Sequence, residues 1–600
     1  MSVKPEPSSQ TQGQSYAAID APARRQPRWD AILSVTGVFL AIVVLASLFY
    51  KQTFTSLSDR EAMDIAQVAR NIANGKGFTT GFVRPFDLAF AEPVSDALPE
   101  LHTAPLYPCL LAFVFGLRGP SEQAVVWLSL AMMLLTAIAT YVLGKTLFDR
   151  ATGILAAILL AVSAPVLKAG TSGQEWATAA LFFTLLLCVL AALHRSASQE
   201  NKLVPPLCGA ACGLLLAALY TTHHILVFLL IPVAAFIVVT GARRWATLIA
   251  FIVFFAVAAS PLVYRNTVYT GSPLLGGSTW DVMANSSAFP GDTFYRSTDP
   301  ANRGVTTALL FPVQHFWAFA RKLAAGSNSI TANLAAMLGL ATLPFALVSV
   351  LYKFKQPHAN AVRGMLYLAV PLMTLAFASF SVSTTCAIIF VPAAAVFASN
   401  YFRLLVASKK LHPFHVKAIV AGLLLVACAP AVTQLAWKTE TASGDSPLAG
   451  DAFFAKAGSL GASGVIYTDV PWTAAWRTTC TAVWLPKSDA DVTALDAAGF
   501  PMQVVILTPE SAGYSDDEAW RALHRVRLWR EYIADPDAGY RQILAAAGIA
   551  DRRAKGGRQY LARLRRAFAV SKSIAGLKPK RMDPLAADDV QVLIARDQEP

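Results

Sequence analysis

Three carboxylates lie close together in the segment that follows the first apolar run of the chain. Ser58 and Glu61 have the spacing of a capping box, and Gly75 is suited to end a helix, so we expect a helix of about four turns between them. Within it Glu61 and Asp64 share one face at i, i+3 spacing, and Asp59 lies in the first turn. Ionised carboxylates can act as general bases, although a capped and solvated helix start would also carry these residues.

Further polar residues stand where apolar runs begin or end. Glu175 opens one run, where a carboxylate also favours a helix N-terminus. Arg265 and Asn266 close another run, where snorkelling and capping would equally explain them. His102 precedes a short apolar segment and suits interfacial hydrogen bonding. The pair at 223–224 falls in a tight turn, and we assign it plain interfacial roles.

The composition indicates that membrane-spanning helices position these residues. Of the 600 residues, 55% are hydrophobic and 14% are charged, against about a quarter charged in soluble proteins. The apolar residues fall in runs long enough to cross a hydrocarbon core as helices. We therefore predict an α-helical polytopic membrane protein. Its transmembrane helices, about eleven in number, are expected near 31–50, 123–143, 152–168, 176–193, 205–222, 224–241, 245–263, 331–352, 364–380, 386–402 and 416–436.

Basic residues predict the orientation of these helices. The formal net charge of +13 could suggest nucleic acid, but much of the charge lies in short loops, and no nucleic-acid partner is expected. With the N-terminus inside, the cytoplasmic connections are basic and the turns near Thr222 and Val382 are not, as the positive-inside rule requires. The basic residues concerned are Arg24, Arg25, Arg28, Lys145, Arg150, Arg195, Lys202, Arg243, Arg244, Lys353, Lys355, Arg403, Lys409 and Lys410.

This orientation places the long connections on the outer face. Residues 105–117 are too few to span, so we predict a juxtamembrane helix there. The transmembrane module is then 31–436, with outer loops 51–122 and 264–330. Residues 1–30 are expected to form a disordered cytoplasmic N-terminus, because they are rich in Ser, Gln, Ala and Pro.

Residues 437–600 have the composition of a soluble unit. Apolar segments at 464–468, 481–485 and 502–508 alternate with helix-compatible stretches, which predicts a small exoplasmic α/β domain. The basic tail at 551–581 is either a solvated helix face or a segment that binds anionic lipid headgroups. Of the seven cysteines only Cys480 lies in this exported part, so no disulfide framework is implied.

Several short stretches follow one another in an order that resembles one family. They are Ala-Arg-Asn-Ile-Ala-Asn-Gly at 69–75, His-Thr-Ala-Pro-Leu-Tyr-Pro at 102–108, an acidic residue at 175, Pro-x-x-x-Arg-Asn-x-x-x-x-Gly-x-Pro at 261–273, and Val-Pro-Trp to Trp-Leu-Pro at 470–486. Because these stretches follow one another in this order and share their predicted side of the membrane, the chain resembles the GT-C class of membrane glycosyltransferases that use polyprenyl-phosphate sugars. That class includes the protein O-mannosyltransferases and the lipid A aminoarabinose transferases.

The resemblance implies an inverting transfer of a sugar from a polyprenyl phosphate to an acceptor hydroxyl or amine at the exoplasmic face. A carboxylate in the first outer loop would act as general base on the acceptor. The acidic pair of the family falls on Glu61 and Ala62, so Glu61, Asp59 and Asp64 are alternatives for the base. For donor phosphate and substrate, the resemblance implies Arg84, His102, Glu175, Arg265 and Asn266, and arginine can bind phosphate bidentately.

No cofactor is evident, and no cluster of His, Cys or Asp has metal-ligand spacing, so a divalent metal is implied by the resemblance alone. The expected partners are the polyprenyl-phosphate sugar, membrane lipids, and a glycan, lipid or protein acceptor. The expected location is a bacterial inner membrane with the C-terminal domain in the periplasm. Two alternatives remain. One is a secondary transporter, which is disfavoured because the predicted spans are almost free of ionisable residues. The other is an inactive assembly or lipid-binding subunit, which is favoured by Ala62 in place of the second acidic residue.

Overall fold

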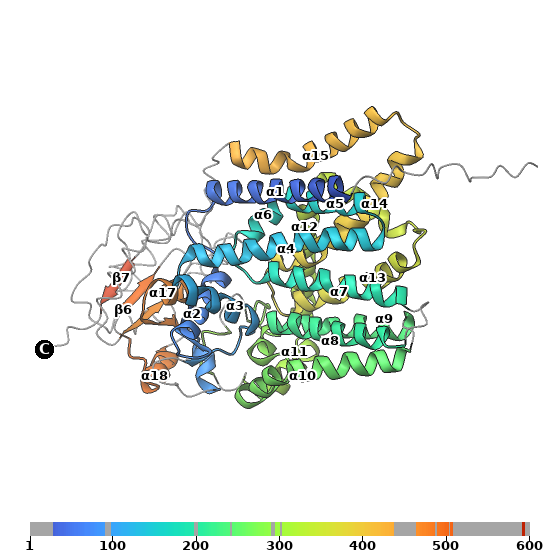
Figure 1. Ribbon diagram of the computed structural model, residues 1–600. Coiled ribbons are helices and arrows are strands. Elements are labelled where there is room, and N and C mark those ends of the chain that lie inside the picture. The colour runs from blue at the N-terminus through green and yellow to red at the C-terminus, as the bar shows by residue number, and fades with distance from the viewer. Residues whose placement is uncertain are drawn as a thin grey trace, which may run out of the picture.

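Long helices run side by side in the structure, and short helices and a small sheet gather at one end of them (Figure 1). This arrangement confirms the predicted fold class, an α-helical membrane protein with a small α/β unit. The computed structural model describes residues 28–90, 98–196, 202–240, 243–289, 294–299, 303–436, 464–486, 489–502, 504–507 and 591–594.

In this described part, nine helices are long and apolar enough to cross a membrane. Each of them corresponds to a predicted span. Such segments must be helical, because an unpaired backbone amide or carbonyl facing hydrocarbon is too costly. The nine are α1 (Arg28–Thr53), α4 (Glu122–Leu147), α7 (Trp176–Ser196), α8 (Val204–Thr222), α10 (Arg244–Thr270), α12 (Phe316–Leu351), α13 (Pro357–Ser379), η6 (Thr384–Phe390) continued by α14 (Val391–Ser408), and α15 (Pro413–Ala436).

Two predicted spans are not single long helices, so the expected number of about eleven is corrected to nine, or ten with a bent pair, among the described residues. The span predicted at 152–168 divides into α5 (Arg150–Ala161) and α6 (Ala164–Gly170), which meet at 72°. Pro165 lies in the first turn of α6, where its missing N–H favours a new helix start over a continued helix. The span predicted at 224–241 is a 3₁₀ turn, η2 (His224–Leu229), followed by the short helix α9 (Leu230–Thr240).

The first outer loop carries the predicted amphipathic helix, now α2 (Arg60–Ala73). Its N-cap is Asp59 rather than the predicted Ser58, because the Asp59 carboxylate accepts a hydrogen bond from the Ala62 amide at 2.9 Å. Asn74 is its C-cap, and Gly75 follows with a φ of 77°, so the predicted C-terminal role of Gly75 moves by one position.

The predicted juxtamembrane helix is α3 (Leu106–Arg118), which contacts α2 and α4. It is confirmed as a short helix outside the set of possible spans.

A five-stranded sheet forms the core of the C-terminal unit. Its order is β2-β5-β4-β6-β7, with β2, β5, β4 and β6 parallel and β7 antiparallel. The predicted strands are confirmed, but the participation of β2 from the first outer loop is not foreseen by the sequence pattern. The elements are β2 (Phe82–Val83), β4 (Val465–Thr468), α17 (Pro471–Arg477), β5 (Thr481–Trp484), α18 (Asp489–Ala497), β6 (Val504–Leu507) and β7 (Gln591–Ile594).

Because β2 pairs with β5, the C-terminal unit and the first outer loop form one structure. Phe82 lies opposite Ala482 in this pairing. Arg70 of α2 donates hydrogen bonds to the backbone carbonyls of Trp476 and Ala475 at 2.6 and 2.5 Å, at the end of α17. Of the predicted disordered segment 1–30, residues 28–30 belong to α1, and residues 1–27 lie outside the described residues, as do the predicted domain boundary at 437 and the basic tail 551–581.

The other end of the bundle collects the basic connections. His358 makes a hydrogen bond to the Leu147 carbonyl at 3.0 Å. Arg403 pairs with Asp149, with 2.6 Å between Nη1 and Oδ2. The connections between α4 and α5, between α12 and α13, and after α14 therefore meet on the side away from α2, as the predicted alternation of loops requires.

Helices α8 and α10 pack closely against each other. A Cβ built on Gly209 would lie 2.3 Å from the carbonyl oxygen of Thr247, and one on Gly213 would lie 2.3 Å from that of Phe251. This Gly-x-x-x-Gly spacing allows two membrane helices to pack backbone against backbone.

We expect Gly213→Ala to destabilise the protein by about 1–3 kcal/mol, because the added methyl group must push α8 away from α10. Thermal unfolding of the detergent-purified protein checks this. Gly422→Ala in α15 is the matched control, since a Cβ there meets nothing within 4 Å. Equal unfolding temperatures for the two variants would show that the close approach is dispensable.

Candidate functional site

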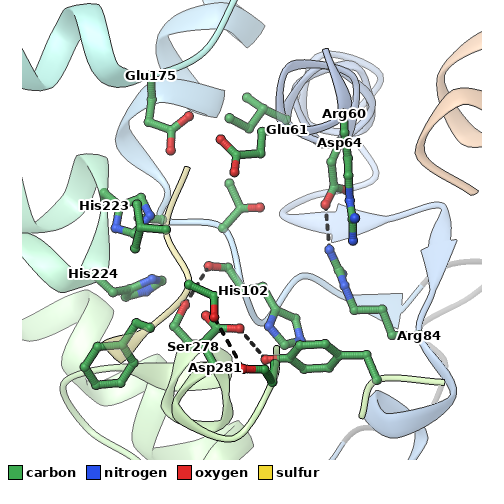
Figure 2. Close-up of a pocket in the computed structure, with 18 of the residues that line it drawn as sticks. Arg60, Glu61, Asp64, Arg84, His102, Glu175, His223, His224, Ser278 and Asp281 are labelled. Carbon is green, nitrogen blue, oxygen red and sulfur yellow. Dashed lines mark hydrogen bonds and ion pairs between the residues drawn. The ribbon is translucent and has the colours of Figure 1, made fainter. Parts of the chain in front are cut away.

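A cavity of about 290 Å³ opens between α2 and one end of the helix bundle (Figure 2). Its lining comes from α2, the loop after β2, the turn before α3, the start of α7, the junction of α8 and η2, the loop around η3 (Gly276–Val282), the turn before η6, and β5. Among the residues predicted from the sequence it includes Glu61, Asp64, Arg84, His102 and Glu175.

Glu61 and Glu175 form an acidic wall of this cavity. Gln174 holds one of them in place, because its Nε2 donates to Glu61 Oε2 at 3.1 Å and to Asp59 Oδ2 at 3.0 Å. Burial raises the pKa of Glu61 well above its ordinary value, and the negative charge of Glu175 raises it further. Burial also raises the pKa of Glu175, to about 7. Both carboxyl groups of this wall therefore release their protons at higher pH than ordinary glutamates do.

The opposite side carries an ion-pair network built on Arg84. Its guanidinium lies 2.5 Å from Asp64, 3.8 Å from Asp87 and 3.9 Å from Glu100. Burial opposes the charged form of Arg84, but the three carboxylates together raise its pKa above the ordinary value. Burial also raises the pKa of Asp64, and the Arg84 guanidinium opposes that rise.

His102 belongs to the same network. Its Nε2 lies 2.9 Å from Asp87 Oδ1. Burial disfavours the imidazolium form, but the Asp87 carboxylate outweighs this and raises the pKa of His102. Glu100 accepts hydrogen bonds from the amides of His102 and Thr103 at 2.8 and 2.9 Å, which fixes the turn that leads into α3. We name Arg84 and His102 the basic wall.

The floor of the cavity is the loop around η3. Lys322 of α12 holds it, since the ammonium donates to the carbonyls of Val282 and Ala284 at 3.1 and 2.6 Å and to that of Asp281. The Asp281 side chain accepts a hydrogen bond from the Tyr295 hydroxyl. A membrane helix thus determines where the η3 loop presents its side chains.

Three of the predicted site residues do not line the cavity. Asp59 is occupied as the cap of α2 and as an acceptor for Gln174. The Arg265 guanidinium lies over the ring of Phe78, 4.6 Å from its centre. Asn266 is buried and donates to the Pro273 carbonyl at 3.4 Å. Asn266 therefore supports the loop that leads to η3 from behind.

Other cavity residues escape the sequence analysis. Arg60 lies over Trp472 and Trp484, 4.2 and 5.0 Å from the ring centres, and Trp484 lines the cavity. The position of Arg60 next to Glu61 is a signal that could have been used. Trp484 belongs to the Trp-Leu-Pro stretch of the resemblance, but that stretch does not indicate a place in the cavity, which depends on the pairing of β2 with β5. His223 and His224, assigned to interfacial roles, lie in the cavity wall.

The metal implied by the resemblance finds no ligand set in the part of the chain that the structure describes. No three side chains of His, Cys, Asp or Glu converge there as metal ligands do. We derive no step through a metal ion.

Comparison with known proteins places this geometry in context. A model of the family described as dolichyl-phosphate-mannose-protein mannosyltransferase matches residues 102–264. A search of curated protein sequences found no significant match.

Solved structures resemble the chain over most of its length at low sequence identity. An oligosaccharyltransferase of Archaeoglobus fulgidus, tethered to an acceptor peptide, has a TM-score of 0.54 at 10% identity, covering 81% of this chain and 70% of its own. The same organism's AglB, in complex with an inhibitory peptide and a dolichol-phosphate, has a TM-score of 0.49 at 12% identity, with 80% and 70% covered. ArnT from Cupriavidus metallidurans has a TM-score of 0.39 at 11% identity, with 80% and 94% covered.

Proposed function

From the GT-C fold that this chain shares with the archaeal oligosaccharyltransferase, we propose that it is an integral membrane glycosyltransferase. It transfers a sugar from a polyprenyl-phosphate donor to an exoplasmic lipid, polysaccharide or protein acceptor, with inversion at the sugar carbon. The observation that carries this proposal is the cavity in which a carboxylate wall faces a wall of arginine and histidine. The donor class follows the description of the matched family, whose sugar is carried by a dolichyl phosphate.

Glu61 is the best candidate for the general base. It lines the cavity and accepts a hydrogen bond from Gln174. Asp64 is neutralised by Arg84 at 2.5 Å, and Asp59 caps α2 outside the cavity. In its ionised form Glu61 would take the proton of the acceptor hydroxyl while the oxygen forms a bond to the sugar carbon. Attack from the face opposite the phosphate inverts that carbon.

The basic wall suits the leaving group. As the bond between the sugar carbon and the phosphate oxygen breaks, the lipid phosphate keeps the electron pair and gains negative charge. Arg84 Nη1 is buried and has no hydrogen-bond partner among the described residues, so it is available to donate to this phosphate. His102, whose pKa is raised, supplies a second positive group.

We place the cavity on the exoplasmic side of a bacterial inner membrane. Basic residues are concentrated at the opposite helix ends, which the positive-inside rule assigns to the cytoplasm. A donor with its sugar on the outer leaflet would then meet the cavity directly.

Amide substitutions separate the three carboxylates. We expect Glu61→Gln to reduce sugar transfer by about 10²- to 10⁴-fold, because Gln cannot accept the proton but can still accept the bond from Gln174. Asp59→Asn should stay within a few-fold of the parent, since Asn caps helices as well as Asp. Transfer is measured as consumption of polyprenyl-phosphate sugar, with thermal unfolding as the folding control. Unchanged transfer in Asp59→Asn, Glu61→Gln and Asp64→Asn would remove this loop as the catalytic site.

The acid limb of the pH–rate profile should report Glu61. Its raised pKa means that the base form appears, and the rate rises, as the pH increases through that value. Glu175→Gln removes a negative charge that raises this pKa, so we expect the acid limb to move to lower pH. Initial rates across the pH range measure this, with Asp149→Asn at the other end of the bundle as control. A limb that does not move in Glu175→Gln would separate Glu175 from the base.

The orientation is tested by cysteine labelling. In a background with Cys109 and Cys480 replaced by Ser, we introduce Lys76→Cys in the first outer loop and Lys353→Cys between α12 and α13, both exposed. A maleimide that does not cross membranes should label the first in cells whose inner membrane is intact, and the second only after that membrane is permeabilised. The reverse result would contradict the exoplasmic assignment.

A further inference from the structure

Two adjacent histidines form a third side of the cavity that the proposed reaction does not use. His223 ends α8 and His224 begins η2, and both line the cavity. Figure 2 shows their rings on the side of the cavity away from Asp64 and Arg84. They are carried by the membrane helices, whereas the wall around Arg60 and Trp484 belongs to the water side.

The backbone fixes the tautomer of His223. Its Nδ1 accepts a hydrogen bond from the Ile225 amide at 3.3 Å, as the N-cap of η2. An amide N–H can only donate, so the ring proton must reside on Nε2 when the ring is neutral. Burial lowers the pKa of His223 to about 4, which keeps the ring neutral at pH 7. The ring also packs on Trp176, with 4.7 Å between ring centres, which fixes its orientation.

His224 presents an unused polar atom. Its side chain is 1% exposed, and its Nε2 is buried without a hydrogen-bond partner among the described residues. A buried polar atom with no partner is unfavourable, and native proteins keep few of them. The edge-on contact with the Tyr220 ring, with 6.0 Å between ring centres, does not require a nitrogen at this position. The Nε2 atom of His224 is therefore left to form a hydrogen bond with a ligand.

We propose that His223 and His224 bind hydroxyl groups of the sugar carried by the lipid-linked donor. This inference rests on the proposed function and adds the sugar-binding side of the same cavity. Neutral imidazoles exchange hydrogen bonds with hydroxyls, which both donate and accept. The permanent positive charge that a phosphate requires is supplied by Arg84. Since both histidines stand at helix ends in the membrane, they face a sugar presented from the bilayer.

The test compares two kinds of lipid on the full-length protein in detergent. The first is a polyprenyl phosphate without sugar, and the second is a polyprenyl phosphate that carries mannose, glucose or galactose. His223→Asn keeps an acceptor for the Ile225 amide, because Asn is a good cap, but lacks the distal N–H. His224→Phe keeps the ring and removes the unpartnered nitrogen. His315→Asn, on an exposed residue outside the cavity, is the matched control.

We expect the parent protein to bind one sugar-bearing lipid more tightly than the sugar-free lipid. Each cavity variant should weaken that binding by about 10-fold, the effect of one lost hydrogen bond, and leave binding of the sugar-free lipid unchanged. Thermal unfolding should show both variants folded, and His223→Gln, which restores a distal amide N–H, should recover part of the affinity.

Several results would overturn the inference. Equal weakening of both lipids would assign the histidines to the phosphate. Unchanged binding of the sugar-bearing lipid by the His223 and His224 variants, with or without lost stability, would make these histidines structural. A parent protein that binds no sugar-bearing lipid more tightly than the sugar-free lipid would mean that this side of the cavity recognises no donor sugar. The proposed function is judged separately, because it falls when the parent protein consumes no polyprenyl-phosphate sugar, and it stands when the parent transfers sugar and the histidine variants bind both kinds of lipid like the parent.

Discussion

The hydrocarbon core of a membrane forces every backbone N–H and C=O within it to be paired, and this constraint shapes the whole molecule. Spanning segments are consequently helices almost without ionisable side chains, and polar chemistry is displaced to the ends where helices stop. Here the short helix α2, the start of α7, the end of α8 and the turn before η6 all contribute polar residues to one cavity. The cavity is surrounded by apolar packing, which is why its carboxyl groups hold protons more strongly than in water.

The same burial makes the charges of the cavity interdependent. Asp64 is matched to Arg84, and His102 is matched to Asp87, so most charge on that side is compensated within the network. Burial raises the pKa of both Glu61 and Glu175, and the charge of Glu175 raises that of Glu61 further although Arg60 opposes it, so their side of the cavity is the one suited to gain or lose a proton. A buried site with one compensated wall and one titratable wall is suited to a reaction that moves a proton at one end of the substrate and develops negative charge at the other.

The C-terminal unit is part of this site as well as an appendage of the bundle. The pairing of β2 with β5 ties the first outer loop into its sheet. The hydrogen bonds from Arg70 to the end of α17 secure the contact, and Trp484 then reaches the cavity. A change in how the unit docks would therefore alter the wall around Arg60 without touching a carboxylate.

Local patterns in the amino-acid sequence were sufficient to locate the helices and strands and the faces that they present. Hydropathy located the long spans, capping residues and spacing located α2 with Glu61 and Asp64 on one face, and apolar alternation located β4, β5 and β6. These are local properties, because a helix or strand repeats its side-chain directions at a fixed period. Which elements face one another depends on the tertiary structure. In the folded chain Glu175 and Glu61 line the same cavity, whereas Asp59 serves as a helix cap. Asn266 supports the η3 loop from outside the cavity, and Arg265 also lies outside it. His223, His224 and Trp484 also line the cavity. Those outcomes depend on packing between segments far apart in the chain, and the periodicity of one segment carries no information about its distant partner.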